Sequence, residues 1–198
     1  MGFFDALFGR TRLTKPDMDR LFALSTAAPS LRDAAGLAPD GATGVCLRPV
    51  EGSAYARAEE ELWDLVRLAC RSPDFHTQPE VTRDGLGFTW ALFRGADPTE
   101  GVALAHLVGT TLQEKGFGEQ LLAATFRHHR TDAPPGPPAE GPVYLIYNYK
   151  RGRFHPFAPR PGHERDDATE FRLSASLDRL LPMEKDLTRW YALWDCPV

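Results

Sequence analysis

The stretch Glu80–Arg94, EVTRDGLGFTWALFR, decides the fold class that the sequence predicts. Two runs with a period of two residues flank Asp84-Gly85, and this dipeptide tolerates the positive φ angles of a tight hairpin turn. Both sides of the second run are largely apolar: one side carries Phe88, Trp90 and Leu92, and the other carries Thr89, Ala91 and Phe93. We therefore predict an antiparallel hairpin whose second strand lies inside a sheet.

Helices are predicted on both sides of this hairpin. Upstream, residues 55–70 repeat apolar side chains at the i, i+4, i+7, i+8 spacing of one buried helix face. Downstream, a second helix is expected over residues 97–116, with Asp97 as its N-cap and Glu100 reaching back to complete the cap. Gly116 is expected to end this helix.

The rest of the chain repeats the same order. Residues 121–127 and 143–150 are predicted strands, and Asp167 and Glu170 are expected to cap a last helix. The order after residue 50 is therefore helix, two strands, helix, two strands, helix. It predicts an α+β fold with a largely antiparallel sheet and helices packed on one face. In outline this order is secretion-chaperone-like, an analogy that depends on element order alone.

Length and composition restrict the possible classes. A chain of 198 residues is expected to form one domain, from which a Pro-rich loop at residues 131–142 extends into solvent. The net charge of −4 argues against binding of nucleic acid by the surface as a whole. No apolar run is long enough to span a bilayer, and the first residues do not resemble a secretory signal. We therefore expect a cytoplasmic protein.

The sequence contains no recognisable catalytic or metal-binding motif. Cys46, Cys70 and Cys196 are far apart and form no C-x-x-C pair, so neither a disulfide framework nor a thiolate metal site is predicted. His128 and His129 are adjacent on a predicted strand, where side chains point to opposite faces, and they are interpreted as surface residues. No cofactor and no metal are predicted, and an enzymatic role is disfavoured.

The basic, Pro-rich stretch at residues 149–169, YKRGRFHPFAPRPGHERDDAT, is a second candidate region. Phe154 and Phe157 are expected to anchor it to the core, and its prolines stiffen it. Its cationic groups either pair with carboxylates at the start of the last helix or bind an external anion or a partner. A small enzyme that uses this region is the remaining alternative. The candidate residues are Lys150, Arg151, Arg153, His155, Arg160 and Arg165.

The first residues, MGFFDALFGR, give a third candidate. In a short helix at residues 1–12, the apolar side chains would share one face. This amphipathic segment either packs on its own domain, docks on a partner, or makes peripheral contact with the inner face of a membrane. The candidate partner-binding residues are Phe3, Phe4, Leu7 and Phe8.

Several of these stretches together resemble one family. MGFFDALFGR, GVCLRPVEG at 44–52, GFTWALFRG at 87–95, YKRGRFHPFAPRPGHERD at 149–166 and LPMEKDLTRWYALW at 181–194 are similar to the PspA-associated protein family PspAB of actinobacteria. The resemblance covers almost the whole chain. It implies an accessory protein linked to the membrane-stress protein PspA and to HtpX-type membrane proteases, and it supplies no catalytic residues. We therefore predict a non-enzymatic adaptor that acts through protein–protein contacts; the alternative is a small enzyme or an anion- or lipid-sensing domain.

Overall fold

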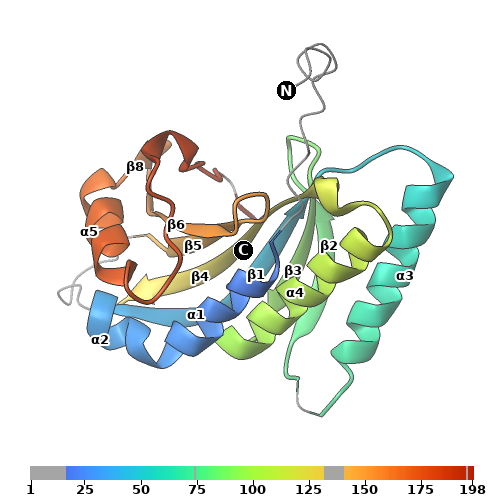
Figure 1. Ribbon diagram of the computed structural model, residues 1–198, viewed down its shortest axis with the longest axis horizontal. Helices are drawn as coiled ribbons and strands as arrows, with labels where there is room; N and C mark the ends of the chain where they lie inside the picture. The colour runs from blue at the N-terminus through green and yellow to red at the C-terminus, as the bar shows by residue number, and fades with distance from the viewer. Residues whose placement is uncertain (1–16, 74, 132–140, 195) are drawn as a thin grey trace, which may run out of the picture.

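The computed structural model describes residues 17–73, 75–131, 141–194 and 196–198. The amphipathic segment predicted at residues 1–12 lies outside the described residues, as does most of the predicted Pro-rich loop at 131–142. Figure 1 shows the arrangement of the described elements.

A six-stranded sheet forms the centre of the fold, and every neighbouring pair of its strands is antiparallel. Its order is β2-β3-β1-β4-β5-β6. The predicted α+β class with an antiparallel sheet is therefore confirmed. The strands are β1 (Leu37–Leu47), β2 (Gln78–Arg83), β3 (Thr89–Arg94), β4 (Leu121–Arg130), β5 (Val143–Asn148) and β6 (Arg153–Phe157); a separate small ribbon consists of β7 (Pro159–Arg160) and β8 (Glu164–Arg165).

The hairpin predicted from the opening stretch is present. Arg83 pairs with Thr89 at its closed end, and the Asp84 carboxylate accepts hydrogen bonds from the backbone N–H groups of Leu86 (3.0 Å) and Phe88 (2.9 Å). Because β1 pairs with the other side of β3, the strand lies inside the sheet as predicted. The apolar character of both of its sides thus reflects burial on both sides.

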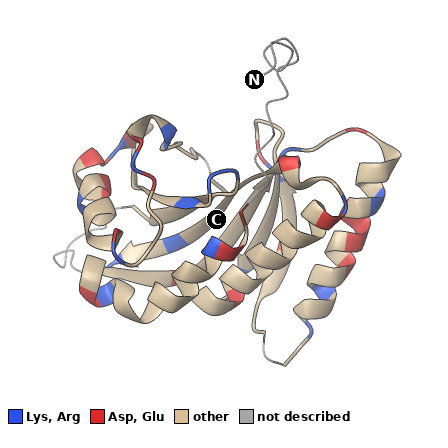
Figure 2. Ribbon diagram, in the orientation of Figure 1, with Lys and Arg blue, Asp and Glu red and all other residues tan. Residues whose placement is uncertain are grey.

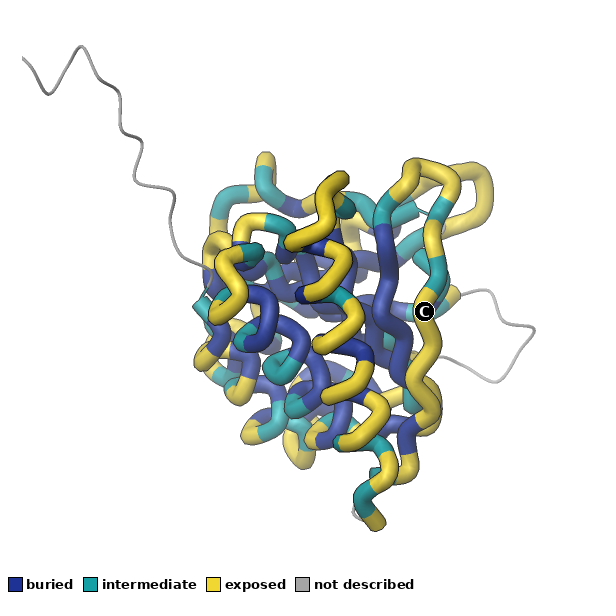
Figure 3. The backbone as a smooth tube through the Cα atoms, turned by 90° about the vertical axis from the view of Figure 1, so that its right-hand side faces the viewer, coloured by how far each residue is buried: buried dark blue, intermediate teal, exposed yellow. Residues whose placement is uncertain are grey.

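Helices pack on one face of this sheet and share a single core with it (Figure 1). α4 lies between α1 and α3, and its inner side chains are buried, whereas the outer side of α3 is exposed (Figure 3). The α-helices are α1 (Phe22–Ala27), α2 (Leu31–Ala35), α3 (Ser53–Ala69), α4 (Pro98–Glu114) and α5 (Asp167–Leu177), and the short 3-10 helices are η1 (Asp19–Leu21), η2 (Ala28–Ser30), η3 (Gly118–Gln120) and η4 (Leu187–Arg189).

Two capping predictions are partly wrong, and both errors have the same cause. Asp97 caps α4 as predicted, because its carboxylate accepts from the N–H groups of Thr99 (2.7 Å) and Glu100 (2.9 Å). Glu100 does not reach back to the cap: its carboxylate accepts from the Thr77 hydroxyl at 2.7 Å and from the His76 N–H at 3.2 Å. At α5 the N-cap is Asp166 and not Asp167. In each helix a distant loop takes the carboxylate that local spacing had assigned to the cap.

The second face of the sheet, opposite the helices, is partly covered by the C-terminal segment, of which residues 190–194 and 196–198 are described. The hydroxyl of Tyr144 donates to the backbone oxygen of Val198 at 3.2 Å. Gly44 makes room for this end, because a Cβ atom there would lie 2.4 Å from a methyl group of Val198. The side chains buried on this face form a second hydrophobic core, which consists of Cys46, Trp90, Leu92, Ala123, Tyr144, Ile146, Phe157 and Val198. The aromatic C-terminal segment therefore packs back onto the body of the protein.

Glu170 ties the Pro-rich stretch to α5 from inside the protein. Its carboxylate is 1% exposed and accepts from the Ala158 N–H at 2.9 Å and from Arg165 Nε at 3.0 Å. The neighbouring acid, Asp167, is exposed at the first turn of the helix. These two carboxylates, predicted to share the same capping role, therefore differ in burial and in partners.

We expect Glu170→Ala to lower the free energy of unfolding by about 3 kcal/mol or more, because it leaves a guanidinium and a buried N–H without their acceptor. The matched variant Asp167→Ala should cost less than about 1 kcal/mol, the usual contribution of an exposed acid at a helix N-terminus. Urea unfolding followed by circular dichroism measures both. Similar losses in the two variants would contradict the structural role given to Glu170.

Candidate functional site

A cavity of about 460 Å³ opens on the second face of the sheet. This volume falls within the range of about 300–1,000 Å³ that is typical of ligand pockets. Its floor is the sheet, one wall is the β2–β3 turn, and the other wall is the C-terminal segment. The lining residues are Cys46, Trp90, Leu122, Ala123 and Ile146 from the floor, Asp84, Leu86 and Phe88 from the turn, Tyr191, Ala192, Leu193 and Trp194 from the segment, and Arg48, Asn148 and Lys150 at the end of the sheet.

The wall formed by the β2–β3 turn is fixed to the floor by Asp84. One oxygen of this carboxylate accepts from Trp90 Nε1 at 2.8 Å, and the other accepts the two N–H groups of the turn itself. Three donors therefore occupy the acid. We infer from this that Asp84 positions the turn and the Trp90 indole and is not a free acid for chemistry.

The opposite wall is held by hydrogen bonds to the backbone of the C-terminal segment. Arg165 Nη1 donates to the Trp190 carbonyl at 2.9 Å, and His155 Nε2 donates to the Tyr191 carbonyl at 3.1 Å. Because a carbonyl can only accept, His155 carries its proton on Nε2, and Nδ1 is buried without a partner among the described residues. The imidazole also stacks on Trp190, with ring centroids 6.3 Å apart.

Burial lowers the pKa of His155 to about 4, although its hydrogen bond to Tyr191 acts in the opposite direction. The ring is therefore neutral near pH 7. A protonated ring would place a charge without a partner between the sheet and the C-terminal segment. Burial of that charge opposes protonation, whereas the hydrogen bond to Tyr191 does not, because a protonated ring also donates from Nε2.

The thiol in the lining of the cavity is not ionised near pH 7. Cys46 is 3% exposed, and burial raises the pKa of its thiol to about 12, so the thiol is protonated and unreactive near pH 7. No histidine or glutamate is among the lining residues, and their one carboxylate, Asp84, is occupied by the three donors described above. Asn148 has a buried Oδ1 without a hydrogen-bond partner in the described part of the chain, which leaves an acceptor available at the end of β5.

Arg48 and Lys150 supply the cationic character of this cavity. Both are exposed, and neither forms an ion pair with any described residue. Figure 2 shows basic colouring on the turn between β5 and β6, where Lys150 lies, whereas the strands of the floor are mostly uncharged. An apolar hollow with two available cations at its margin suits an apolar group that is accompanied by negative charge.

The six residues predicted in the basic stretch do not converge on one site. Arg160 pairs with Asp166 at 2.8 Å, Arg165 pairs with Glu170, and Arg153 Nη1 donates to the Met183 carbonyl at 3.1 Å. Burial acts to raise the pKa of Asp166, but hydrogen bonds from Thr169 and Arg160 outweigh it and lower that pKa. Of the six, Lys150, Arg151 and Arg160 are exposed, and only Lys150 lines the cavity, whereas His155 is 1% exposed. Phe3, Phe4, Leu7 and Phe8 lie outside the described residues.

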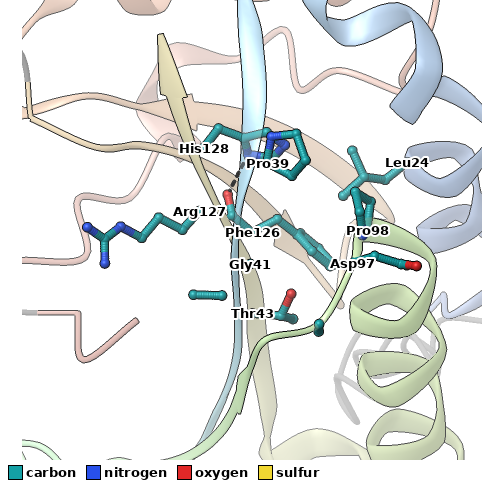
Figure 4. A pocket seen from close by; sticks show the side chains of 11 residues that line it. Leu24, Pro39, Gly41, Thr43, Asp97, Pro98, Phe126, Arg127 and His128 are labelled. Atoms are coloured by element: carbon teal, nitrogen blue, oxygen red, sulfur yellow. Dashed lines mark hydrogen bonds between the residues drawn. The ribbon is translucent and has the colours of Figure 1, made fainter. Parts of the chain in front are cut away.

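The interpretation of both adjacent histidines as surface residues is wrong for one of them. His128 is 2% exposed, its Nδ1 donates to the Phe126 carbonyl at 2.9 Å, and burial lowers its pKa to about 4. It borders a small pocket beside Pro39 and Asp97 (Figure 4). That pocket holds about 10 Å³, room for roughly one water molecule, so it is too small for a substrate.

The cavity itself could not be assembled from sequence spacing, because its walls come from residues more than a hundred positions apart. The available signals were the two apolar sides of β3 and the aromatic C-terminal segment. In the described part of the chain, no three histidine, cysteine or acidic side chains are grouped so that they could hold a metal ion. Within the same residues, no helix has both the length and the apolar composition that crossing a bilayer requires.

The fold and the cavity define an α+β protein that carries a ligand-sized apolar hollow on the face of its sheet opposite the helices. The chain belongs to the PspAB family, PspA associated protein B, whose family model matches residues 1–198. The resemblance found in the sequence is therefore confirmed. Comparisons with curated proteins and with solved structures found no match, so the secretion-chaperone-like analogy stays a prediction.

The burial of His155 predicts a loss of stability in mild acid. In the unfolded chain the ring has its ordinary pKa of 6.5, whereas in the folded protein the pKa is about 4. Between these values the unfolded state binds more protons, so the free energy of unfolding falls as the pH is lowered from about 6.5 to 4. The loss from pH 7 to pH 5 should be on the order of 2 kcal/mol for each such histidine.

Urea unfolding at pH 7 and pH 5 measures this loss. We expect His155→Gln to reduce the pH dependence and not to abolish it, because His128 contributes in the same direction. His129→Gln, which changes an exposed ring on β4, is the matched control and should keep the wild-type pH dependence. An unchanged pH dependence in His155→Gln would show that this ring does not link protonation to folding.

Proposed function

We propose that this chain is a cytoplasmic, non-enzymatic accessory protein of the PspA membrane-stress response, and that it binds a protein partner in the cavity of the second face. The family description, PspA associated protein B, supports an association with a PspA-like protein. The cavity is the observation that carries the proposal, because it combines ligand-sized volume, an apolar lining and the absence of a catalytic pair among its lining residues.

The shape and chemistry of the cavity favour an apolar protein segment as its occupant. Docking of an amphipathic helix into an apolar groove is a common mode of recognition, in which a few large side chains fill the hollow. Leu86 from the β2–β3 turn and Trp194 from the C-terminal segment both line it. Exposed Arg48 and Lys150 would contact acidic residues that flank such a segment. We therefore expect the partner to present large apolar side chains next to carboxylates.

The buried ionisable groups of the described residues support a binding role. Glu100, Glu170 and Asp84 each accept hydrogen bonds from backbone N–H groups of loops or turns. His128 and His155 are buried and donate to carbonyls. These groups have structural partners and lie apart from one another, so they offer no acid–base pair to a substrate.

Binding of a purified PspA-like protein, measured by isothermal titration calorimetry, tests the proposal. Leu86 is 83% exposed on one wall of the cavity, so Leu86→Asp should leave folding intact and weaken binding at least tenfold. Leu68→Asp is the matched control, since Leu68 is 65% exposed on α3, on the helical side of the sheet. Equal affinity of wild type and Leu86→Asp would reject the cavity as the partner site.

A membrane protease of the HtpX type is the second partner suggested by the family resemblance, and the same titration distinguishes it. If only the protease binds and Leu86→Asp abolishes that binding, the cavity is retained as the site and the PspA-like partner is rejected. If neither protein binds wild type, the adaptor function itself fails.

A further inference from the structure

We infer that residues 1–12 of this chain occupy its own cavity when no partner is bound, so that segment and partner compete for one site. This inference rests on the proposed function for its regulatory meaning. The occupancy of the cavity by residues 1–12 can be tested independently of any partner.

The point at which the described chain begins carries the first step. The Asp17 N–H donates to the Tyr149 carbonyl at 2.9 Å, and the Tyr147 hydroxyl donates to the Asp17 carbonyl at 2.7 Å. Asp17 also lies against Gly152, where an added Cβ would come within 2.9 Å of its side chain. Residue 17 is therefore fixed beside the β5–β6 turn, and Lys150 of that same turn lines the cavity.

The length of the preceding chain is sufficient to reach the cavity. Phe8 is nine residues before Asp17. Nine residues span at most about 30 Å, which is far more than the connection from one side of a sheet end to the other requires. If residues 1–9 formed a helix, it would be about 13 Å long, a length suited to the space between two walls of a ligand-sized cavity.

The apolar side chains of residues 1–12 match the apolar lining of the cavity. Phe3, Phe4, Leu7 and Phe8 would provide the large apolar side chains that its lining can cover. Asp5 is the single acid among these twelve residues, and Arg48 and Lys150 are cations of the cavity without an ion-pair partner among the described residues. The same twelve residues also contain Arg10 and Arg12, so the match with the cavity lies in the large apolar side chains and not in the net charge.

Three other occupants fit an apolar cavity of this size: the same segment of a second copy, a small amphipathic anion, and the partner alone. The length and starting point of the preceding chain favour the intramolecular occupant, because a tethered segment has a high effective concentration at a site that it can reach. A partner would then have to displace the segment. In the free protein, docking of residues 1–12 would remove from water both the apolar side chains of this segment and the apolar lining of the cavity.

Photo-crosslinking of the full chain tests the occupancy directly. Benzoylphenylalanine is introduced at position 4, in the apolar stripe, or at position 9, on the opposite side of a helical wheel, and the products are mapped by mass spectrometry. We expect position 4 to crosslink within one chain to residues 84–88 and 191–194, and position 9 to give at least fivefold less of these products. Crosslinks confined to the helical side of the sheet, or only between chains, would overturn the inference.

Binding of the dye 1-anilinonaphthalene-8-sulfonate gives a second readout in the full chain. The wild type should bind little dye, and a variant with serine at positions 3, 4, 7 and 8 should bind about tenfold more. Adding Leu86→Asp to that variant should remove the gain. Strong binding by the wild type would show an open cavity, and weak binding by both proteins would show that the segment does not control access; either result overturns the inference.

The partner experiment separates the two proposals. A saturating PspA-like protein should lower the intramolecular crosslinks of position 4 at least fivefold. If position 4 never reaches the cavity while Leu86→Asp still weakens partner binding, the inference fails and the proposed function stands. If the crosslinks form and no partner displaces them, the proposed function fails and the cavity remains the docking site of residues 1–12.

Discussion

A sheet with two apolar faces is the constraint on which the rest of this structure depends. On β3, Ala91 and Phe93 are buried on the helical side, and Trp90 and Leu92 are buried on the other. Each square ångström of apolar surface left in water costs about 25 cal/mol, so both faces must be covered. The helices cover one face only. The C-terminal segment covers part of the other, and it passes from His155 on β6 to Gly44 on β1. The cavity is the part of this face that the segment leaves open.

Two buried carboxylates and the half-buried Asp84 connect the loops that this arrangement requires. Glu100 holds residues 76 and 77, Glu170 holds the Pro-rich stretch after β6, and Asp84 holds the β2–β3 turn. Each carboxylate accepts a hydrogen bond that a loop N–H would otherwise donate to water. An irregular backbone can therefore be buried without an unsatisfied N–H group. In this way the three carboxylates are already occupied by donors of the protein itself.

Local patterns were sufficient to predict the hairpin, α3, α4 and the antiparallel class, because each of these depends on residues close in the sequence. They were not sufficient for Glu100 or Glu170, whose partners are 24 and 12 residues away, or for His128, which β1 and its neighbours bury.

The β6 strand was missed because Pro156 interrupts its pattern. Its free edge is completed by residues 182–184: the Phe154 N–H donates to the Pro182 carbonyl at 2.9 Å, and the Phe154 carbonyl accepts from the Glu184 N–H at 2.7 Å. The cavity is formed where the sheet, the β2–β3 turn and the C-terminal segment come together, and these parts are far apart in the sequence. Sequence spacing could therefore indicate its aromatic residues but not that they line one cavity.

The two walls of the cavity differ from its floor in how they are held, and this difference bears on function. The floor belongs to a continuous ladder of six strands, whereas the C-terminal wall is held to the body by a few hydrogen bonds to its backbone and by aromatic packing. Segments held by few contacts open at a lower free energy than the strands beneath them. We therefore expect the width of the cavity to change without loss of the core. A binding protein that must accept a large apolar group gains from a rigid floor and an adjustable wall, since the floor preserves the fold while the wall adapts to the occupant.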